Sequence, residues 1–248
     1  MRLISYHAVL LMTLSIISMT ASAANIKADI APFAEHSQLL VVTVLQANDV
    51  HGTLQRYEKT NQQWHKVGEP WPVLVGANGV NKQQEGDKRA PSGIYALTQL
   101  FGYAQQTTLT EHHLPYLPLT AEMVCVDDVD SPHYNRIITP TYAVGTRPQH
   151  RTWNSDEGMR RDLHYQQDMR YELGIVVAYN TQQARAQHSR LGAGSCIFLH
   201  VWKTPQTPTS GCTAMSFDNI QVLHQWLRLT AKPLLIQGVA GNLPIQLD

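Results

Sequence analysis

Hydrophobic and polar positions in the first half of the chain alternate over short stretches with the two-residue period of β-strands. Residues 38–48 form an apolar run rich in β-branched side chains, and residues 51–69 alternate on either side of a polar turn. A short apolar run at 71–80 contains a Gly/Asn turn, and a Pro-Ser-Gly turn at 91–93 precedes another strand. Residues 38–80 are therefore predicted to form a β-meander.

The second half combines buried strands with two helical segments. Continuous apolar runs predict strands at residues 173–180, 194–202 and 232–240, after a short strand around Cys125. Helical periodicity at 155–171 predicts one helix with Ser155 as a candidate N-cap, and residues 216–231 predict a second with Ser216 or Asp218 as the cap. Many short strands with two helices predict a mostly β (α+β) fold in one domain, with the helices packed at one side.

The N-terminus has the pattern of an export signal. Met1 and Arg2 give a positive start, residues 8–19 are apolar but too few for a comfortable membrane span, and small residues end the segment at Ala23. We expect a signal peptide over residues 1–23, cut after Ala23, and a mature domain over 24–248. The alternative is an uncleaved anchor helix. Cleavage would leave a periplasmic or secreted protein with no stable membrane insertion.

Charge and cysteine content narrow the classes of function. The 248 residues carry 19 Lys and Arg against 19 Asp and Glu, for a net charge of zero, and no basic tract is present. This balance argues against a nucleic-acid partner. The chain has three cysteines. In an exported protein one pair can form a disulfide, which leaves one thiol to be explained.

The stretch CIFLHVWKTPQTPTSGCTAM, residues 196–215, places a histidine at the end of a predicted strand and a cysteine after the loop that follows. A cysteine nucleophile needs a base that takes its proton, and an imidazole can do so. Gly211 would permit a tight turn before Cys212, and a helix starting after Cys212 would direct N–H groups at the sulfur. The alternative is a buried structural cysteine and a structural His200, and spacing alone does not decide between the two.

The segments FLHVW…TSGCTAM and PSGIYAL resemble the signature of the L,D-transpeptidase (YkuD-like) family, in which the histidine also precedes the cysteine. The similarity extends over residues 39–240. It implies one L,D-transpeptidase-like β-sandwich or barrel domain, with Cys212 as nucleophile and His200 as base. It also implies action on peptidoglycan stem peptides, without metal or cofactor: Cys212 attacks a diaminopimelate carbonyl, D-Ala leaves, and an amine or water resolves the thioester.

Several features depart from the pattern of that family: the loop from His200 to Cys212 is short, and Val201 follows His200 where typical members have a glycine. Ser210 stands where typical members have a histidine before the Gly-Cys pair, and Ala214 stands where they carry an arginine. These departures indicate a divergent branch with altered oxyanion and substrate-carboxylate contacts. Ser210, Gly211 and Thr213 are the candidate residues for such contacts.

The remaining candidates concern the rest of the cleft. Cys125 and Cys196, each in a predicted strand, are the preferred disulfide pair because that pairing leaves Cys212 free, while two unpaired buried thiols are the alternative. The polar cluster at 127–135 lacks the spacing of an EF-hand or zinc site, so no metal site is predicted. Tyr134, Asn135 and Trp202 are candidate cleft residues, against a solvated turn or a core position.

Three functions are consistent with these residues. The first is an exported cysteine acyltransferase on peptidoglycan, an L,D-transpeptidase. The second is an L,D-carboxypeptidase or amide hydrolase of the same fold. The third is a cell-wall binding module without catalysis. Cys212 and His200 argue against the third function, and Ala214 keeps the second and third open.

Overall fold

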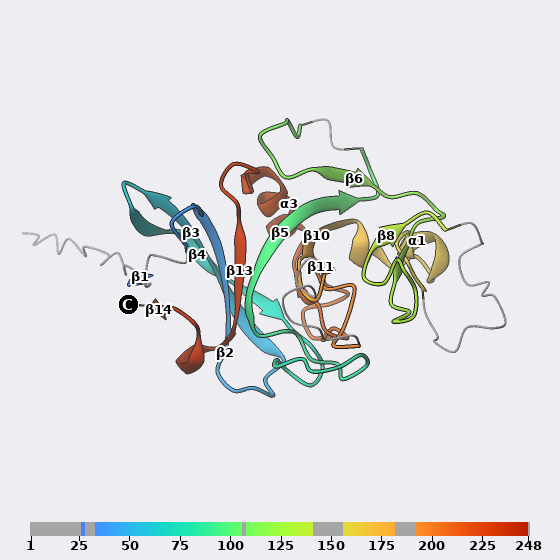
Figure 1. Cartoon of the computed structure of the whole chain (residues 1–248), viewed down its shortest axis with the longest axis horizontal. Helices are drawn as coiled ribbons and strands as arrows, with labels where there is room; N and C mark the ends of the chain where they lie inside the picture. Colours follow the sequence, from blue (N-terminus) through green and yellow to red (C-terminus); the bar gives the residue numbers. More distant parts are fainter. Residues whose placement is uncertain (1–25, 28–32, 106–107, 141–155, 182–191, 248) are drawn as a thin grey trace, which may run out of the picture.

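The computed structural model describes residues 26–27, 33–105, 108–140, 156–181 and 192–247 (Figure 1). The predicted signal peptide at 1–23 and the candidate cap Ser155 lie outside the described residues. Within the described ranges, no helix combines the length and the apolar character needed to span a membrane.

A closed sheet forms the centre of the fold. Within the described part of the chain its eight strands are β2 (Gln38–Val44), β3 (His51–Thr60), β4 (Gln63–Leu74), β5 (Gly93–Gly102), β10 (Leu173–Val177), β11 (Phe198–Val201), β12 (Thr213–Met215) and β13 (Leu234–Val239). They pair in the order β10-β11-β12-β4-β3-β2-β13-β5, and β5 pairs back with β10, which closes a barrel. The predicted mostly β, α+β fold is thus confirmed, and its barrel form is resolved.

Smaller elements surround this barrel (Figure 1). The strands are β6 (Tyr116–Pro118), which extends the sheet beside β5, the three-stranded sheet of β7 (Val124–Val126), β8 (Ile137–Ile138) and β9 (Asp156–Gly158), and the pair β1 (Ile26–Lys27) and β14 (Gln246–Leu247). The helices are α1 (Arg161–His164), α3 (Phe217–Trp226) and the 3-10 turns η2 (Met169–Tyr171) and η3 (Ala240–Asn242). The small sheet and α1 lie together at one end of the molecule, beyond β10 and β11.

Strand β2 is a continuous apolar run because both of its faces pack against a hydrophobic core. Leu40 and Val42 pack into the main core cluster, whereas Leu39 and Val41 belong to a second cluster with Phe33, Trp64 and Ile236. Because successive side chains of a strand point to opposite faces, both faces of β2 are buried. The antiparallel β2–β3–β4 meander predicted from the alternating pattern is confirmed.

The two helix predictions have different outcomes. The second is confirmed in α3, where the Ser216 hydroxyl accepts a hydrogen bond from the Asn219 N–H at 3.3 Å, although the helix ends at Trp226. The first is wrong, because residues 156–171 form β9, the single turn α1 and η2 instead. Gln166 and Gln167 adopt positive φ angles of 51° and 59°, which interrupt a right-handed helix.

Leu40→Ala tests the barrel core. Leu40 has no exposed surface, so we expect the substitution to lower the free energy of unfolding by about 2–5 kcal/mol in urea denaturation. Leu45→Ala is the matched control, because Leu45 follows β2 and is 83% exposed. Its effect should stay within about 0.5 kcal/mol. Equal losses in the two variants would contradict the assignment of Leu40 to the core.

Candidate active site

Two neighbouring parallel strands bring the cysteine and the histidine together. In the β11–β12 pair, Leu199 lies opposite Thr213 and His200 lies opposite Ala214. Cys212 comes directly before β12, so the backbone places it beside the start of β11. The preceding turn is closed by the Thr209 hydroxyl, which accepts from the Gly211 N–H at 3.1 Å and donates to the Cys212 carbonyl at 2.6 Å.

Gly211 is required by the shape of this turn. Its φ angle is +148°, a backbone conformation that other residues rarely adopt. A Cβ atom at this position would also lie 3.0 Å from the Arg89 carbonyl oxygen. The sequence-based expectation of a tight turn at Gly211 agrees with this geometry.

Backbone groups of β11 and the segment before it hold the Cys212 thiol. The Phe198 N–H donates to the sulfur at 3.4 Å, and the thiol donates to the Cys196 carbonyl at 3.4 Å. Burial raises the pKa of Cys212 to about 12, and the Glu157 carboxylate acts in the same direction. The Phe198 N–H, Lys82 and Arg161 oppose this rise without cancelling it. Cys212 is therefore a neutral thiol in this structure.

His200 is buried in β11, and its orientation is defined by two neighbours. Its Nδ1 lies 2.8 Å from the Val201 carbonyl oxygen, and its ring meets the Tyr171 ring edge-on at a centroid distance of 5.4 Å. Because a carbonyl can only accept, the proton of the neutral ring is on Nδ1, which leaves the Nε2 lone pair available as a base. Burial lowers the pKa of His200 to about 4, so the imidazole is neutral at neutral pH.

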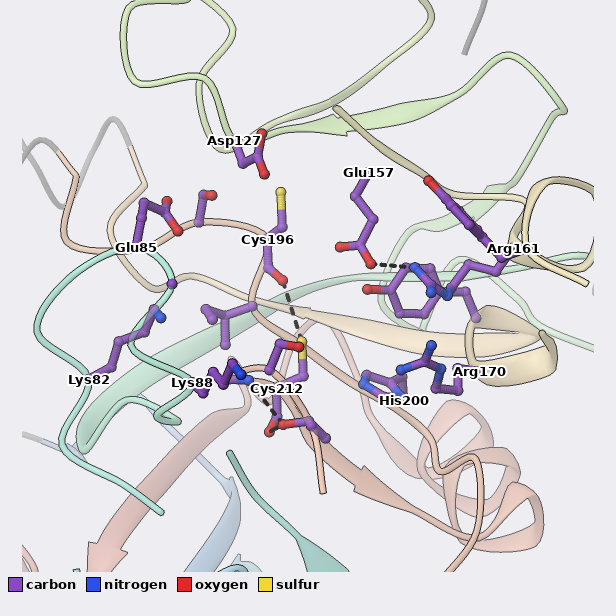
Figure 2. Close-up of a pocket in the computed structure, with 18 residues that line it drawn as sticks. Lys82, Glu85, Lys88, Asp127, Glu157, Arg161, Arg170, Cys196, His200 and Cys212 are labelled. Carbon is purple, nitrogen blue, oxygen red and sulfur yellow. Dashed lines mark hydrogen bonds and ion pairs between the residues drawn. The ribbon is translucent and has the colours of Figure 1, made fainter. Parts of the chain in front are cut away.

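Cys212 and His200 line one cavity of about 420 Å³ (Figure 2). Ser210 and Gly211 contribute to its wall as well. The figure shows Lys82 and Glu85 on one side of Cys212 and Glu157 and Arg161 on the other. Among the described residues, no hydrogen bond joins His200 to Cys212. In substrate-free enzymes the hydrogen bonds between catalytic groups are often long and shorten only when a substrate binds.

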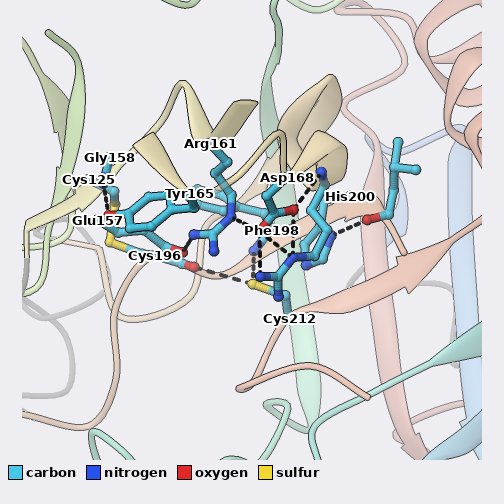
Figure 3. A network of polar contacts seen from close by, with 12 residues as sticks. Cys125, Glu157, Gly158, Arg161, Tyr165, Asp168, Cys196, Phe198, His200 and Cys212 are labelled. Carbon is cyan, nitrogen blue, oxygen red and sulfur yellow. Dashed lines mark hydrogen bonds and ion pairs between the residues drawn. A yellow bond between two sulfur atoms is a disulfide. The ribbon is translucent and has the colours of Figure 1, made fainter. Parts of the chain in front are cut away.

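An ion-pair network lies on the side of the cavity that contains Glu157 and Arg161 (Figure 3). Arg161 contacts Glu157 at 2.5 Å and Asp168 at 2.8 Å, and Arg170 contacts Asp168 at 2.6 Å. Burial alone would raise the pKa of Asp168, but hydrogen bonds from Arg170 and Arg161 outweigh it and hold that pKa well below its ordinary value. Desolvation raises the pKa of Glu157, and the charge of Arg161 opposes it.

The disulfide stabilises the segment that contacts the thiol. Cys125 and Cys196 are bonded, with their Cα atoms 6.0 Å apart, which is the pairing preferred from the sequence and leaves Cys212 as the free cysteine. The Asn135 side chain accepts from the Cys196 N–H at 2.8 Å and donates to the Tyr179 carbonyl at 2.8 Å. Cys196 is thus held from two sides, and its carbonyl is the acceptor for the Cys212 thiol.

Several predicted site residues lie away from the cavity. The Thr213 hydroxyl donates to the Gln237 side chain at 2.6 Å, so Thr213 ties β12 to β13, and it does not line the cavity. Tyr134, Asn135 and Trp202 do not line the cavity. Tyr134 donates to Glu85 at 2.7 Å, Asn135 supports Cys196, and Trp202 lies beside a separate, smaller pocket.

The predicted helix N-terminus at the thiol is also corrected. Strand β12 follows Cys212, and α3 begins only at Phe217, so the Phe198 N–H takes the place expected of helix N–H groups. Sequence reasoning missed Lys82, Glu157, Arg161, Arg170 and Tyr171 as cavity residues. They lie in segments distant from the Cys-His element and carry no motif spacing that would have marked them. No group of three or more His, Cys, Asp or Glu side chains in the described ranges is arranged to bind a metal ion.

Comparisons with known proteins add partial similarities of structure. No protein-family model and no curated protein sequence matches the chain. Among solved structures, Bd1075 of Bdellovibrio bacteriovorus is similar, with 14% identity, a TM-score of 0.42, and coverage of 90% of this chain and 54% of that one. The helical cell shape determining protein Pgp2 from Campylobacter jejuni is similar over 88% of this chain and 51% of its own, with 11% identity and a TM-score of 0.41. The chain thus spans about half the length of these two proteins.

Alkylation of Cys212 tests its buried, neutral state. With a pKa of about 12, the rate of reaction with iodoacetamide should keep rising above about pH 10, because the thiolate is the reactive form. A small free thiol, with a pKa of about 8.5, should level off by about pH 10 and serves as the control. Mass spectrometry should find one alkylated site in the native protein, absent in Cys212→Ala. A plateau by about pH 10 would contradict the raised pKa.

Proposed function

We propose that this protein is an exported cysteine acyltransferase that acts on peptidoglycan stem peptides with L,D-transpeptidase chemistry. The observation that supports the proposal most directly is that the free thiol of Cys212 and the imidazole of His200 line one cavity. The resemblance of the His-loop-Ser-Gly-Cys element and of the Pro-Ser-Gly segment to that family supplies the substrate class. Export rests on the predicted signal peptide at 1–23.

The proposed reaction has two acyl transfers. His200 Nε2 takes the Cys212 proton as the sulfur attacks the carbonyl carbon of the L,D-peptide bond, and a tetrahedral oxyanion forms. The C–N bond then breaks, the His200 proton passes to the departing amine of D-Ala, and a thioester remains on Cys212. An amine of a second stem, or water, attacks the thioester and gives its proton to His200. As the C–S bond breaks, His200 returns this proton to the sulfur, which regenerates the thiol.

The electrostatics of the substrate-free site favour a neutral thiol and a neutral imidazole over an ion pair. Thiol and imidazole are both neutral before substrate binds, so the proton moves during the attack and no ion pair exists beforehand. The Phe198 N–H stabilises charge on the sulfur as the proton leaves. Opposite charges on the cavity wall, such as Glu157 and Lys82, suit a stem peptide that carries both amine and carboxylate groups.

Hydrolysis is the second candidate function. Ala214 stands where related transpeptidases have an arginine, and it is buried in β12 between β11 and β4. A changed substrate contact at this position favours a different acceptor, and water is the simplest. The enzyme would then be an L,D-carboxypeptidase that releases D-Ala and leaves a tripeptide.

Incubation of the mature protein with purified tetrapeptide muropeptides, followed by mass spectrometry, tests both candidates. We expect D-Ala release and a covalent acyl adduct on Cys212, both absent in Cys212→Ala. Cross-linked dimers would identify a transpeptidase, and tripeptide alone a carboxypeptidase. His200→Gln should lower kcat/KM by about 10²–10⁴-fold, because the general base is lost.

His51→Gln is the control for the histidine variant, since His51 is exposed at the start of β3 and does not line the cavity. It should retain wild-type kcat/KM. Absence of turnover on every stem peptide, together with retained binding to isolated cell walls, would overturn the enzymatic proposal in favour of a binding module.

The pH dependence of kcat/KM tests the state of His200. Only the neutral imidazole can accept a proton, and its pKa is lowered to about 4. Activity should therefore persist as the pH falls through 6.5 and decline only near pH 4. Circular dichroism at each pH separates titration from unfolding. A fall in kcat/KM at the ordinary histidine pKa of about 6.5 would show that His200 is not the buried neutral base described here.

A further inference from the structure

Lys82 is a buried cation next to the nucleophile. Its side chain is 3% exposed, and it lines the cavity that contains Cys212. The end of its aliphatic stem lies against Gly194, where an added Cβ would come within 2.0 Å of Lys82 Cε. Its Nζ lies 3.5 Å from the position that a Cβ on Gly211 would take. The ammonium group is therefore beside the residue that directly precedes the nucleophile.

Asp87 holds this ammonium in a buried ion pair and leaves part of its hydrogen-bonding capacity unused. Lys82 Nζ donates to Asp87 Oδ1 at 2.9 Å, but the same carboxylate also accepts the backbone N–H groups of Gln83, Gln84 and Arg89 at 2.7, 3.1 and 3.0 Å. Four donors thus share one carboxylate. An ammonium has three N–H donors, and the hydrogen bond to Asp87 uses one of them.

Lys82 influences the thiol through space. Its charge lowers the pKa of Cys212, against the larger effect of burial, but the described residues include no hydrogen bond between its ammonium and the sulfur. The ammonium is therefore near the reaction centre without serving as the thiol's partner. A group in this position can bind a substrate charge next to the bond that breaks.

The other cations of the cavity are less suited to an additional anion. Arg161 already contacts two carboxylates, Glu157 and Asp168, and Arg170 contacts Asp168 through both Nε and Nη2. Lys88 is exposed on the same loop as Lys82. Asp87 compensates the buried charge of Lys82, and the N–H donors that this pair does not use can bind a substrate group beside the nucleophile.

We propose that Lys82 binds the terminal carboxylate of the substrate residue that leaves when Cys212 attacks. This inference rests on the proposed function and assigns a specificity-determining residue to it. Lys82 lies in the loop that precedes β5, and it supplies a positive charge in place of the arginine that is absent at position 214. An enzyme with this contact cuts only the last peptide bond of a stem, because an internal residue has no carboxylate to present.

Two synthetic tetrapeptide stems test the assignment, one ending in D-Ala with a free carboxylate and one ending in D-alaninamide. The wild-type protein should prefer the free carboxylate in kcat/KM. In Lys82→Met this preference should fall by about 30-fold or more, because a buried charge contact is lost. The loss should come from the carboxylate substrate, mainly through KM, with the amide substrate little changed.

Matched variants control for folding. Lys66→Met removes an exposed lysine of β4 and should keep the wild-type preference. Lys82→Met leaves Asp87 buried without its ammonium, so Lys82→Met/Asp87→Asn is the second test variant, and it too should lose the preference. A thermal melt with a wild-type transition establishes that each variant is folded.

The outcomes separate the two proposals. Turnover by folded Lys82 variants with an unchanged preference for the free carboxylate would overturn the role of Lys82 and leave the acyl-transfer proposal standing. A wild-type enzyme that cleaves both stems equally would do the same. No turnover of either stem by the wild-type protein, with no binding of them by Cys212→Ala, would overturn both.

Discussion

The parallel register of β11 and β12 is the constraint on which the candidate site depends. Because Thr213 pairs with Leu199, the residue before β12 must lie beside the residue before Leu199, and the Phe198 N–H therefore meets the Cys212 sulfur. His200 lies two positions after Phe198 on the same strand. This register is secured from the far side by Gln237, which accepts from the Thr213 hydroxyl and donates to the Pro91 carbonyl at 2.7 Å. A single buried amide thus joins the Cys-His element to the Pro-Ser-Gly turn, the two segments on which the family resemblance is based.

Burial gives this site its particular acid-base character. Low polarity around the thiol and the imidazole disfavours both charged forms, which raises one pKa and lowers the other. A thiolate–imidazolium pair would need charge stabilisation that the substrate-free cavity does not provide. The same low polarity strengthens the interaction of any charge that develops in the reaction with nearby groups such as Lys82 and Arg161. In the proposed mechanism, the chemical step is therefore coupled to occupation of the cavity by a substrate.

Sequence patterns predicted the barrel strands and the Cys-His element because both depend on local order. Residues 38–44 and 234–239 are mostly apolar because both faces of these strands are buried, and a continuous apolar run in the sequence reflects that burial directly. The helix predicted at 155–171 is wrong because the ion pairs of Arg161 and the left-handed backbone of Gln166 and Gln167 set the conformation of that segment. The spacing of apolar residues contains no information on either feature. Lys82 and Glu157 could not be assigned from spacing, since only the closed barrel and the small sheet bring residues so distant in the chain to one cavity.

The site divides into two parts with different sources in the fold. The proposed nucleophile and base come from adjacent barrel strands, whose pairing leaves little freedom. Substrate-facing charges come from the loop around Lys82 and from the segment of β9, α1 and η2, which packs against the barrel. Between them stands Cys196, held by its disulfide and by Asn135, and its carbonyl accepts the thiol. If the proposed function holds, changes in the outer segments can alter substrate choice while the strand pair keeps the chemistry, so the Cys212–His200 pair is compatible with Ala214 at the position where the resembling family carries an arginine.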